Sequence, residues 1–516
     1  MIVKQSDEPD GKPFGNPLSE SLRPGMHSWA KLCDVDARLR LCCAHLGPGG
    51  EGMDFRDTDL TTLAADLRAG RISAEELMRG TLSRIEALNP KLNAFVSLAD
   101  PDRLLAEARA VDAEFARGED PGPLAGIPMG VKDIEDARGL VTTFGSVLWA
   151  EAEPATADSI EVTRLRAAGA IVVGKTNSPE FGCKGATDNA LFGATRNPWD
   201  HDYSPGGSSG GSSAALAAGL VPLATGSDGG GSIRIPAALC GHSGFKPSQG
   251  RVPMGGAPTT GLLAVRGPMT LRLKDTVVAL DVLRGDHPGD IFGLPDDCRP
   301  WQPDYEAREL PERVVWAPTL GFAEIDAEVL RVCNAAVEAL QVAGVEVIEA
   351  EAVFDSHPLP HWWTLWTVLM ARKLGRFRDD PRWERVDPAL RGMVETGLGA
   401  SGVDFALAID ACHHYNDQLE SAFADAPYIL SPTCAGRTPK SGADGTINGR
   451  PTAAWVEMTF GFNMTRNPAA SVHAGLDSDG MPVGLQVVGR QRDDLGVLCA
   501  AGAIEDLLGG PGRAVF

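Results

Sequence analysis

Two segments rich in glycine and serine, residues 204–213 and 226–236, have the composition of a site for nucleophilic chemistry. Glycine permits positive φ and a close backbone approach, so such a loop can aim successive N–H groups at one anionic point. Three glycines directly precede Ser232, whose hydroxyl would then lie beside any oxyanion that it creates by attacking a carbonyl. Both segments lie between apolar stretches and lack the length and polarity of a linker, which indicates ordered loops.

The same residues resemble the amidase signature hydrolases. Residues 206–212 resemble the first glycine- and serine-rich loop of that family, and residues 228–236 resemble its nucleophile loop. The separation of Ser208 and Ser232 equals that of the family's bridging and nucleophilic serines. Further family-like segments are residues 130–133, which match the segment of the catalytic lysine, 174–181, 193–199 and 479–486. The resemblance extends over about residues 57–510, and the combined motifs are far more specific than any one alone.

The resemblance implies a mechanism for this chain. Ser232 would attack the carbonyl carbon of an amide and form an acyl-enzyme. Ser208, in a cis-peptide geometry, would pass the proton of Ser232 to a neutral Lys132. Water would then release the acid, and no cofactor or metal takes part. The expected oxyanion and substrate-binding residues are Gly182, Ser208, Gly229, Gly230, Gly231 and Ser232.

Elementary chemistry agrees with these roles. A serine hydroxyl is a weak nucleophile without an adjacent base. Lysine can be that base only if its pKa falls well below about 10.4, and burial lowers it. We expect Ser209, Asp228 and Arg234 to lie behind the reacting groups, with the Asp–Arg pair orienting the two loops.

The chain departs from the family pattern at a few positions. Gly229 stands where a bulky or β-branched residue is common, and Ser227 stands where threonine is common. Arg466 and His473 lie in a C-terminal stretch where family members more often carry glycine and proline. We expect these changes to alter the shape of the pocket rather than the triad.

The same fold also serves in the A-type subunit of tRNA-dependent amidotransferases, which releases ammonia from glutamine and needs partner subunits. Members in that role usually carry glutamine after the loop arginine, where this chain has Ile235. The Ser-Ser-Leu-Asp-Gln stretch expected downstream is replaced by residues 261–266. The sequence therefore favours a stand-alone amidase, and the complete triad argues against a non-enzymatic binding protein.

Other motifs point to other chemistry. The pattern Gly-x-Ser-x-Gly at residues 207–211 would make Ser209 the nucleophile of a Ser-His-Asp esterase. Residues 169–176 match the P-loop pattern, but their centre reads as a strand and Pro179 follows where a helix should form. Cys183 is expected to be a buried structural cysteine. The histidines that could serve the esterase are His242, His473 and the pair His413 and His414, the pair being expected on a solvated helix face.

Composition narrows the possible partners. The 516-residue chain carries 47 basic and 69 acidic residues, a net charge of −22 that repels nucleic acid and anionic membranes. No stretch reaches the ~18 apolar residues of a membrane-spanning helix. Ten scattered cysteines without a Cys-x-x-Cys pair, and no secretory signal, predict reduced thiols, no metal site and a cytoplasmic protein. The expected partner is a small-molecule amide, and a homodimer is the candidate oligomeric state.

The elements that must position these residues alternate between strands and helices. Residues 127–133 and 170–173 read as strands, residues 158–168 and 213–219 as helices, and residues 314–350 as a β-α-β unit. This predicts an α/β fold, and the family implies one large domain with a central mixed twisted sheet covered by helices. Residues 1–52 read as a disordered extension before a catalytic domain at 53–516. Within that domain, about residues 300–420 are a candidate helical cap, with Trp362, Trp363 and Trp366 on one helix that either packs in the core or lines a substrate entrance.

Overall fold

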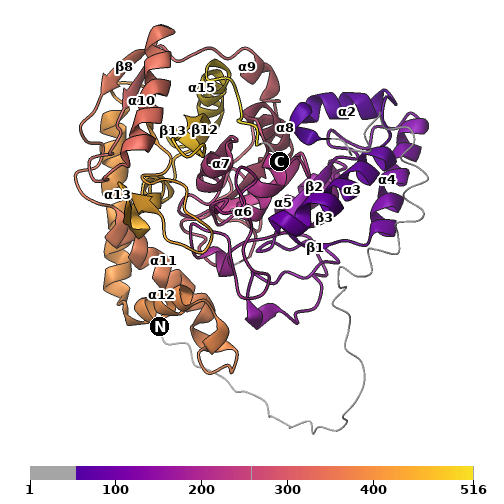
Figure 1. Ribbon diagram of the computed structural model, residues 1–516, viewed down its shortest axis with the longest axis horizontal. Coiled ribbons are helices and arrows are strands. Elements are labelled where there is room, and N and C mark those ends of the chain that lie inside the picture. Colours follow the sequence, from indigo (N-terminus) through magenta and orange to yellow (C-terminus); the bar gives the residue numbers. More distant parts are fainter. Residues whose placement is uncertain (1–53, 257, 515–516) are drawn as a thin grey trace, which may run out of the picture. The chain divides into compact units, whose positions relative to one another are not determined.

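The strands that carry the glycine- and serine-rich loops belong to a five-stranded mixed sheet (Figure 1). In its order β1-β3-β2-β4-β6, β2 runs parallel to β3 and β4, while the two outer strands are antiparallel to their neighbours. The strands are β1 (Phe95–Leu98), β2 (Pro128–Lys132), β3 (Ile171–Thr176), β4 (Leu223–Asp228) and β6 (Val265–Met269). Because β2 and β4 are parallel, their carboxyl ends lie at the same edge of the sheet, and both end in predicted site residues.

A second sheet continues the first. Its order is β5-β12-β13-β9-β7-β8, and its edge strand β5 lies against β6 of the five-stranded sheet. The strands are β5 (Gly244–Lys246), β7 (Arg313–Trp316), β8 (Glu346–Glu349), β9 (Tyr428–Pro432), β12 (Ala469–Leu476) and β13 (Pro482–Gly489), and a separate two-stranded ribbon joins β10 (Thr446–Ile447) to β11 (Arg450–Pro451). The predicted β-α-β unit is confirmed, since β7 and β8 are parallel and α10 (Ala327–Val342) connects them.

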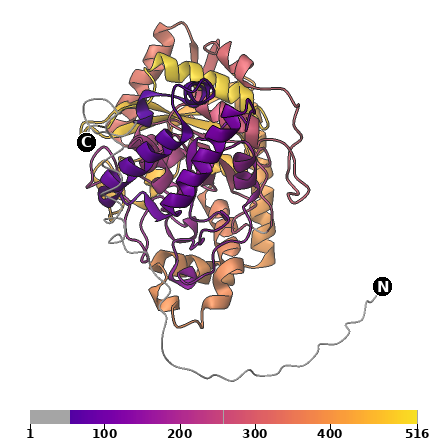
Figure 2. The same cartoon turned by 90° about the vertical axis from the view of Figure 1, so that its right-hand side faces the viewer.

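The structure is a computed structural model that describes residues 54–256 and 258–514, so the predicted N-terminal extension, residues 1–52, lies outside the described residues. In Figure 2 the indigo N-terminal helices lie in front of the strands. The remaining helices are α2 (Leu60–Arg68), α3 (Ala74–Leu92), α4 (Pro101–Ala116), α5 (Ile160–Ala167), α6 (Gly210–Ala217), α7 (Arg234–Cys240), α8 (Leu273–Leu283), α9 (Gln302–Glu306), α11 (Leu359–Leu374), α12 (Pro388–Gly399), α13 (Gly402–Ala422), α14 (Gly461–Met464) and α15 (Asp494–Leu507).

Local chemistry explains where several helices begin. Ser73 and Glu76 form the predicted capping box at the start of α3, because each side chain accepts a backbone N–H of the other. The helix α6, by contrast, is buried along its whole length and contains only glycine, serine, alanine and leucine. Its small side chains let it lie directly behind the strands, so that the serines just before it reach the end of β2.

These elements make a mixed α/β fold in one large domain, as the sequence predicts. Within the region predicted as a helical cap, α11 packs against both α12 and α13 (Figure 1). None of the helices that the structure describes is both long enough and apolar enough to span a bilayer.

Candidate active site

Lys132, the last residue of β2, meets a ring of serine hydroxyls. Its Nζ atom lies 2.7 Å from Oγ of Ser208, 2.9 Å from Oγ of Ser209 and 3.0 Å from Oγ of Ser227. Lys132 is 1% exposed, and Ser208 and Ser209 are buried as well. A hydroxyl can donate to a neutral amine or accept from a charged one, so this ring accommodates either protonation state of Lys132.

The electrostatics of the site favour the neutral amine. Burial lowers the pKa of Lys132 from its ordinary 10.5 to about 7, the charge of Asp228 opposes this shift, and the charge of Arg266 adds to it. Arg266 lies opposite Ser227 in the β4–β6 pairing and forms an ion pair with Glu135. Lys132 can therefore take up a proton near neutral pH, which an exposed lysine cannot.

Ser208 follows a cis peptide bond and faces a glycine. The peptide bond between Gly207 and Ser208 is cis, as the family resemblance implies. Gly182 faces the Ser208 hydroxyl so closely that a Cβ atom on Gly182 would lie 3.1 Å from Oγ. The structure therefore brings Gly182, Ser208 and Lys132 together, as predicted.

The loop that ends in Ser232 is held by its carbonyl groups. All four carbonyls from Gly229 to Ser232 accept hydrogen bonds, and the backbone N–H of Ser209 supplies the one to Ser232 at 3.2 Å. The N–H of Gly231 is already occupied, because it donates to Asp228 Oδ1 at 2.7 Å. Within residues 54–256 and 258–514, the N–H groups of Gly229, Gly230 and Ser232 have no acceptor, so these three donors are available to an oxyanion.

Ser232 is more exposed than Ser208 and Ser209. It is 9% exposed, whereas Ser209 is 0% exposed. Its hydroxyl makes no hydrogen bond with any described residue, so in this conformation it is not bonded to Ser208. Catalytic hydrogen bonds of free enzymes often form only when substrate is bound.

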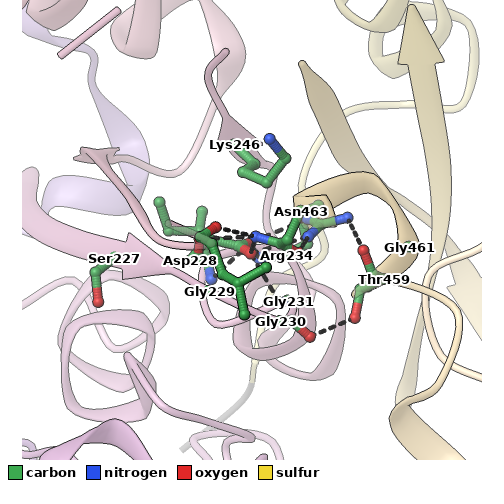
Figure 3. A network of polar contacts seen from close by, with 12 residues as sticks. Ser227, Asp228, Gly229, Gly230, Gly231, Arg234, Lys246, Thr459, Gly461 and Asn463 are labelled. Carbon is green, nitrogen blue, oxygen red and sulfur yellow. Dashed lines mark hydrogen bonds and ion pairs between the residues drawn. The ribbon is translucent and has the colours of Figure 1, made fainter. Parts of the chain in front are cut away.

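A buried network of polar contacts around Asp228 and Arg234 holds the nucleophile loop in place (Figure 3). Arg234 donates from Nε and Nη2 to the two oxygens of Asp228, both at 2.9 Å, and both side chains are 0% exposed. Burial alone would raise the pKa of Asp228, but the charge and hydrogen bonds of Arg234 outweigh it and hold that pKa well below its ordinary range. The predicted orienting role of this pair has a clear geometric basis, since the same carboxylate also accepts the N–H groups of Gly231 and Ile233.

Sequence reasoning missed several members of this network. Asn463 donates to the backbone and side-chain oxygens of Asp228 at 2.8 and 2.9 Å, and it accepts from Arg234 at 2.7 Å. Gln486 on β13 also accepts from Arg234, at 2.6 Å. In the sequence, Asn463 lies in an atypical stretch, and Gln486 is the last residue of a family-like segment. Neither position carries a local pattern that reveals a buried arginine as its partner.

The nucleophile-elbow alternative finds no support in this geometry. Ser209 is fully buried and contacts Lys132, not a histidine. Both ring nitrogens of His242 are engaged elsewhere, by Ser213 Oγ at 2.8 Å and the Ser243 carbonyl at 2.9 Å. Among the described residues, no hydrogen bond joins Ser209 to the other nominated histidines, His413, His414 and His473.

The other residues whose motifs suggested different chemistry have structural surroundings that do not support it. Lys175, the lysine of the P-loop-like pattern, is buried in β3, where its amine donates to Thr142 Oγ1 at 3.0 Å and to the Glu135 carbonyl. Cys183 is buried, and burial raises the pKa of its thiol. His413 and His414 are exposed on α13. The described part of the chain contains no group of three or more His, Cys, Asp or Glu side chains placed to hold a metal ion.

A mixed α/β fold with a buried lysine, two loop serines and a backbone oxyanion site defines a serine hydrolase of the Ser-Ser-Lys class. The sequence profile described as Amidase matches residues 76–498, and the chain belongs to this amidase family. It is therefore an enzyme that hydrolyses amide C–N bonds through a serine acyl-enzyme.

Individual relatives agree with this assignment. The chain is 35% identical over 454 residues to an acylamidase of Rhodococcus erythropolis, covering 86% of this chain and 94% of the relative. It is 34% identical over 480 residues to the A-type subunit of the glutamyl-tRNA(Gln) amidotransferase of Chloroflexus aurantiacus, covering 87% and 96%. A bacterial aryl acylamidase of the amidase signature family has a similar solved structure, with a TM-score of 0.82, 28% identity, and coverage of 87% of this chain and 96% of that one.

Proposed function

We propose that this chain is a stand-alone amidase for linear carboxylic amides, with Ser232 as nucleophile, Ser208 as proton bridge and Lys132 as base. One observation carries the proposal. The amine of Lys132 is buried, has a pKa near 7 and lies 2.7 Å from the hydroxyl of Ser208, whose loop is hydrogen-bonded to Ser232. A buried amine at that position has the basicity that a serine nucleophile needs.

The proposed reaction follows from these positions. The hydroxyl of Ser232 turns toward Ser208 and loses its proton through Ser208 to the neutral Lys132, while its oxygen bonds to the amide carbon. The resulting oxyanion is bound by the free N–H groups of Gly229, Gly230 and Ser232. The C–N bond then breaks as Lys132 returns the proton through Ser208 to the leaving nitrogen. A water molecule attacks the ester by the same proton path and releases the acid and free Ser232.

The proposal uses only groups of this chain and a small-molecule amide. It also places the protein in the cytoplasm, a location supported by the cysteines of the described residues, which are all free thiols. A homodimer remains the proposed oligomeric state. The region 300–420 is proposed as a cap because its helix α11 contacts the nucleophile loop through Trp362.

An A-type amidotransferase subunit is the second candidate, because such a protein is among the relatives. Against it stand Ile235, in place of the usual glutamine, and residues 261–266, which lack the expected Ser-Ser-Leu-Asp-Gln stretch. A stand-alone amidase hydrolyses its substrates without partner subunits. Release of ammonia from glutamine only after addition of such subunits would favour the second candidate.

The proposal is tested by trapping the acyl-enzyme. The purified chain is assayed on a panel of linear amides, lactams and esters, and the intact mass and the peptides of the trapped adduct are measured. We expect the fastest turnover with a linear amide, an adduct on the peptide of Ser232, and none in Ser232→Ala. Ser209→Ala is the matched control and should still acylate. An adduct on Ser209, or an adduct in Ser232→Ala, would overturn the assignment of the nucleophile.

A further inference from the structure

A tryptophan outside the family motifs holds the first peptide of the nucleophile loop. Trp362 lies on α11, and its indole Nε1–H donates to the carbonyl of Gly229 at 3.0 Å. Its ring stacks with that of Trp366, at a centroid distance of 4.9 Å, and with that of Phe460, at 5.2 Å. These two ring contacts and the hydrogen bond together hold the direction of its N–H group.

The loop lies so close to these rings that only glycine fits. A Cβ atom on Gly229 would lie 2.9 Å from Cζ3 of Trp366, and one on Gly230 would lie 2.7 Å from Cζ2 of Trp362. This contact explains why Gly229 stands where a larger residue is common. The space that a larger side chain would fill is occupied by the tryptophans of α11.

The hydrogen bond to Gly229 acts on the next residue through the peptide plane. In a trans peptide the C=O of one residue and the N–H of the following residue point in opposite directions. Trp362 therefore holds the Gly230 N–H as well, although it does not touch that group. Thr459 does the same one residue later, since its hydroxyl donates to Gly230 O at 2.6 Å and the Gly231 N–H then donates to Asp228.

The N–H groups of Gly230 and Gly231 differ in whether they are free to bind a substrate. That of Gly231 is used inside the protein, whereas that of Gly230 has no acceptor in the described ranges 54–256 and 258–514. The Gly230 N–H is oriented, unoccupied and only two residues before Ser232. Such a donor can stabilise a tetrahedral intermediate.

We propose that Trp362 is a positioning residue that aims the Gly230 N–H at the oxyanion of the substrate. This inference rests on the proposed function, because it assumes attack by Ser232. Under this proposal, the helix α11 of the cap contributes to the rate of the reaction through Trp362. The aromatic rings also cover the loop, but the proposal concerns the hydrogen bond alone.

The test compares two tryptophans of the same helix. Trp362→Phe removes the hydrogen bond and keeps a ring in the stack. Trp366→Phe is the matched control, because the Trp366 N–H is buried without a partner in the described structure, so the same truncation removes no hydrogen bond. Both variants are first compared with the unchanged protein by thermal unfolding. The kcat and KM are then measured on the amide that the unchanged enzyme hydrolyses fastest, together with inhibition by the trifluoromethyl ketone analogue of that amide.

For Trp362→Phe we expect kcat to fall about 10-fold, as for one lost hydrogen bond, with KM nearly unchanged. Inhibition by the ketone, which forms a tetrahedral adduct with the serine, should weaken by a similar factor. Trp366→Phe loosens the packing against Gly229 but removes no hydrogen bond, so it should lower kcat and weaken inhibition by a clearly smaller factor than Trp362→Phe does. Equal losses in the two variants, or a change in KM alone, would overturn the proposal.

Two further variants keep the result interpretable. If Trp362→Phe fails to fold, Trp362→Met provides a long apolar side chain without a hydrogen-bond donor, and the same separation of kcat from KM is expected. Ser232→Ala separates the two levels of inference. Retained amide hydrolysis in that variant would refute the proposed nucleophile, whereas its loss together with an unaltered kcat in Trp362→Phe would refute only the role of the tryptophan.

Discussion

The nucleophile loop is supported on two sides by different chemistry. On one side, a fully buried carboxylate, Asp228, binds two backbone N–H groups of the loop and is neutralised by Arg234. The carbonyls of the loop form its uncharged side, where they accept from Trp362 and Thr459, and the Thr459 carbonyl in turn accepts from Arg234 (Figure 3). Charge taken out of water is costly to leave unpaired, while a neutral hydrogen bond contributes about 1 kcal/mol. The charged side should therefore control whether the loop folds, and the uncharged side how fast it reacts.

The most severe test of this contrast removes the carboxylate. Asp228→Ala leaves the Arg234 guanidinium buried without its counter-charge, and we expect the free energy of unfolding to fall by about 3–5 kcal/mol. Chemical denaturation measures the change. Glu328→Ala is the control, because its partner Arg331 is exposed and such pairs contribute about 0–1 kcal/mol. A loss for Asp228→Ala as small as that of the control would show that the charged side is not structural.

A second cation on the charged side sharpens the comparison. Burial, and then the charge of Arg234, lower the pKa of Lys246 from 10.5 to about 7, against the opposing charges of Asp228 and Asp494. Between about pH 7 and 10.5 the unfolded chain therefore binds more protons at this position, so stability rises with pH there.

Replacing Lys246 with methionine should remove that part of the rise. We expect the unfolding free energy of the unchanged protein to climb more steeply than that of Lys246→Met between pH 7 and 10.5, by at most roughly 1.4 kcal/mol per pH unit. Denaturation at several pH values measures both slopes, and the contribution of Lys132 cancels in the difference. Parallel curves would mean that Lys246 stays charged in the folded protein.

The smallest effect belongs to the uncharged side. Thr459→Val keeps the shape of the side chain but leaves the Gly230 carbonyl without its hydroxyl donor, and we expect a loss of about 1 kcal/mol in the free energy of unfolding. Thr459→Ser keeps the hydroxyl and should lose less. The comparison is made by chemical denaturation of both variants. A loss for Thr459→Val that approaches that of Asp228→Ala would erase the distinction between the two sides.

The two sides also differ in how far the sequence reveals them. Asp228 and Arg234 lie six residues apart in one motif, so their pairing follows from local sequence. The spacing of Ser208 and Ser232 and the capping box at Ser73 are local signals of the same kind. Asp228 and Asn463, by contrast, are 235 residues apart. A contact of that separation depends on the packing of both sheets, which a single sequence does not encode in any short pattern.

The tryptophans show the same limit. Their spacing on α11 is equally compatible with a core helix and with a wall of the active site, because periodicity reports burial and not the identity of the partner. The structure places Trp366 in the core cluster, next to Gly229, while the lining of a substrate entrance by the tryptophans stays a prediction. The unusual glycine at position 229 was the one available sign that a large side chain from elsewhere fills this space.

The guanidinium of Arg234 has a consequence for how the enzyme unfolds. It binds Asp228 at the end of β4 in one sheet and Gln486 on β13 in the other. Gln486 in turn donates to Ser431 on β9, so a single cation ties the chemistry of the N-terminal half to strands contributed by the last hundred residues. Separation of the two halves would break these hydrogen bonds and leave the buried Arg234 with fewer partners. We therefore expect loss of activity and loss of the second sheet to occur together, and a fragment that ends before β9 to retain the triad residues without the contacts that arrange them.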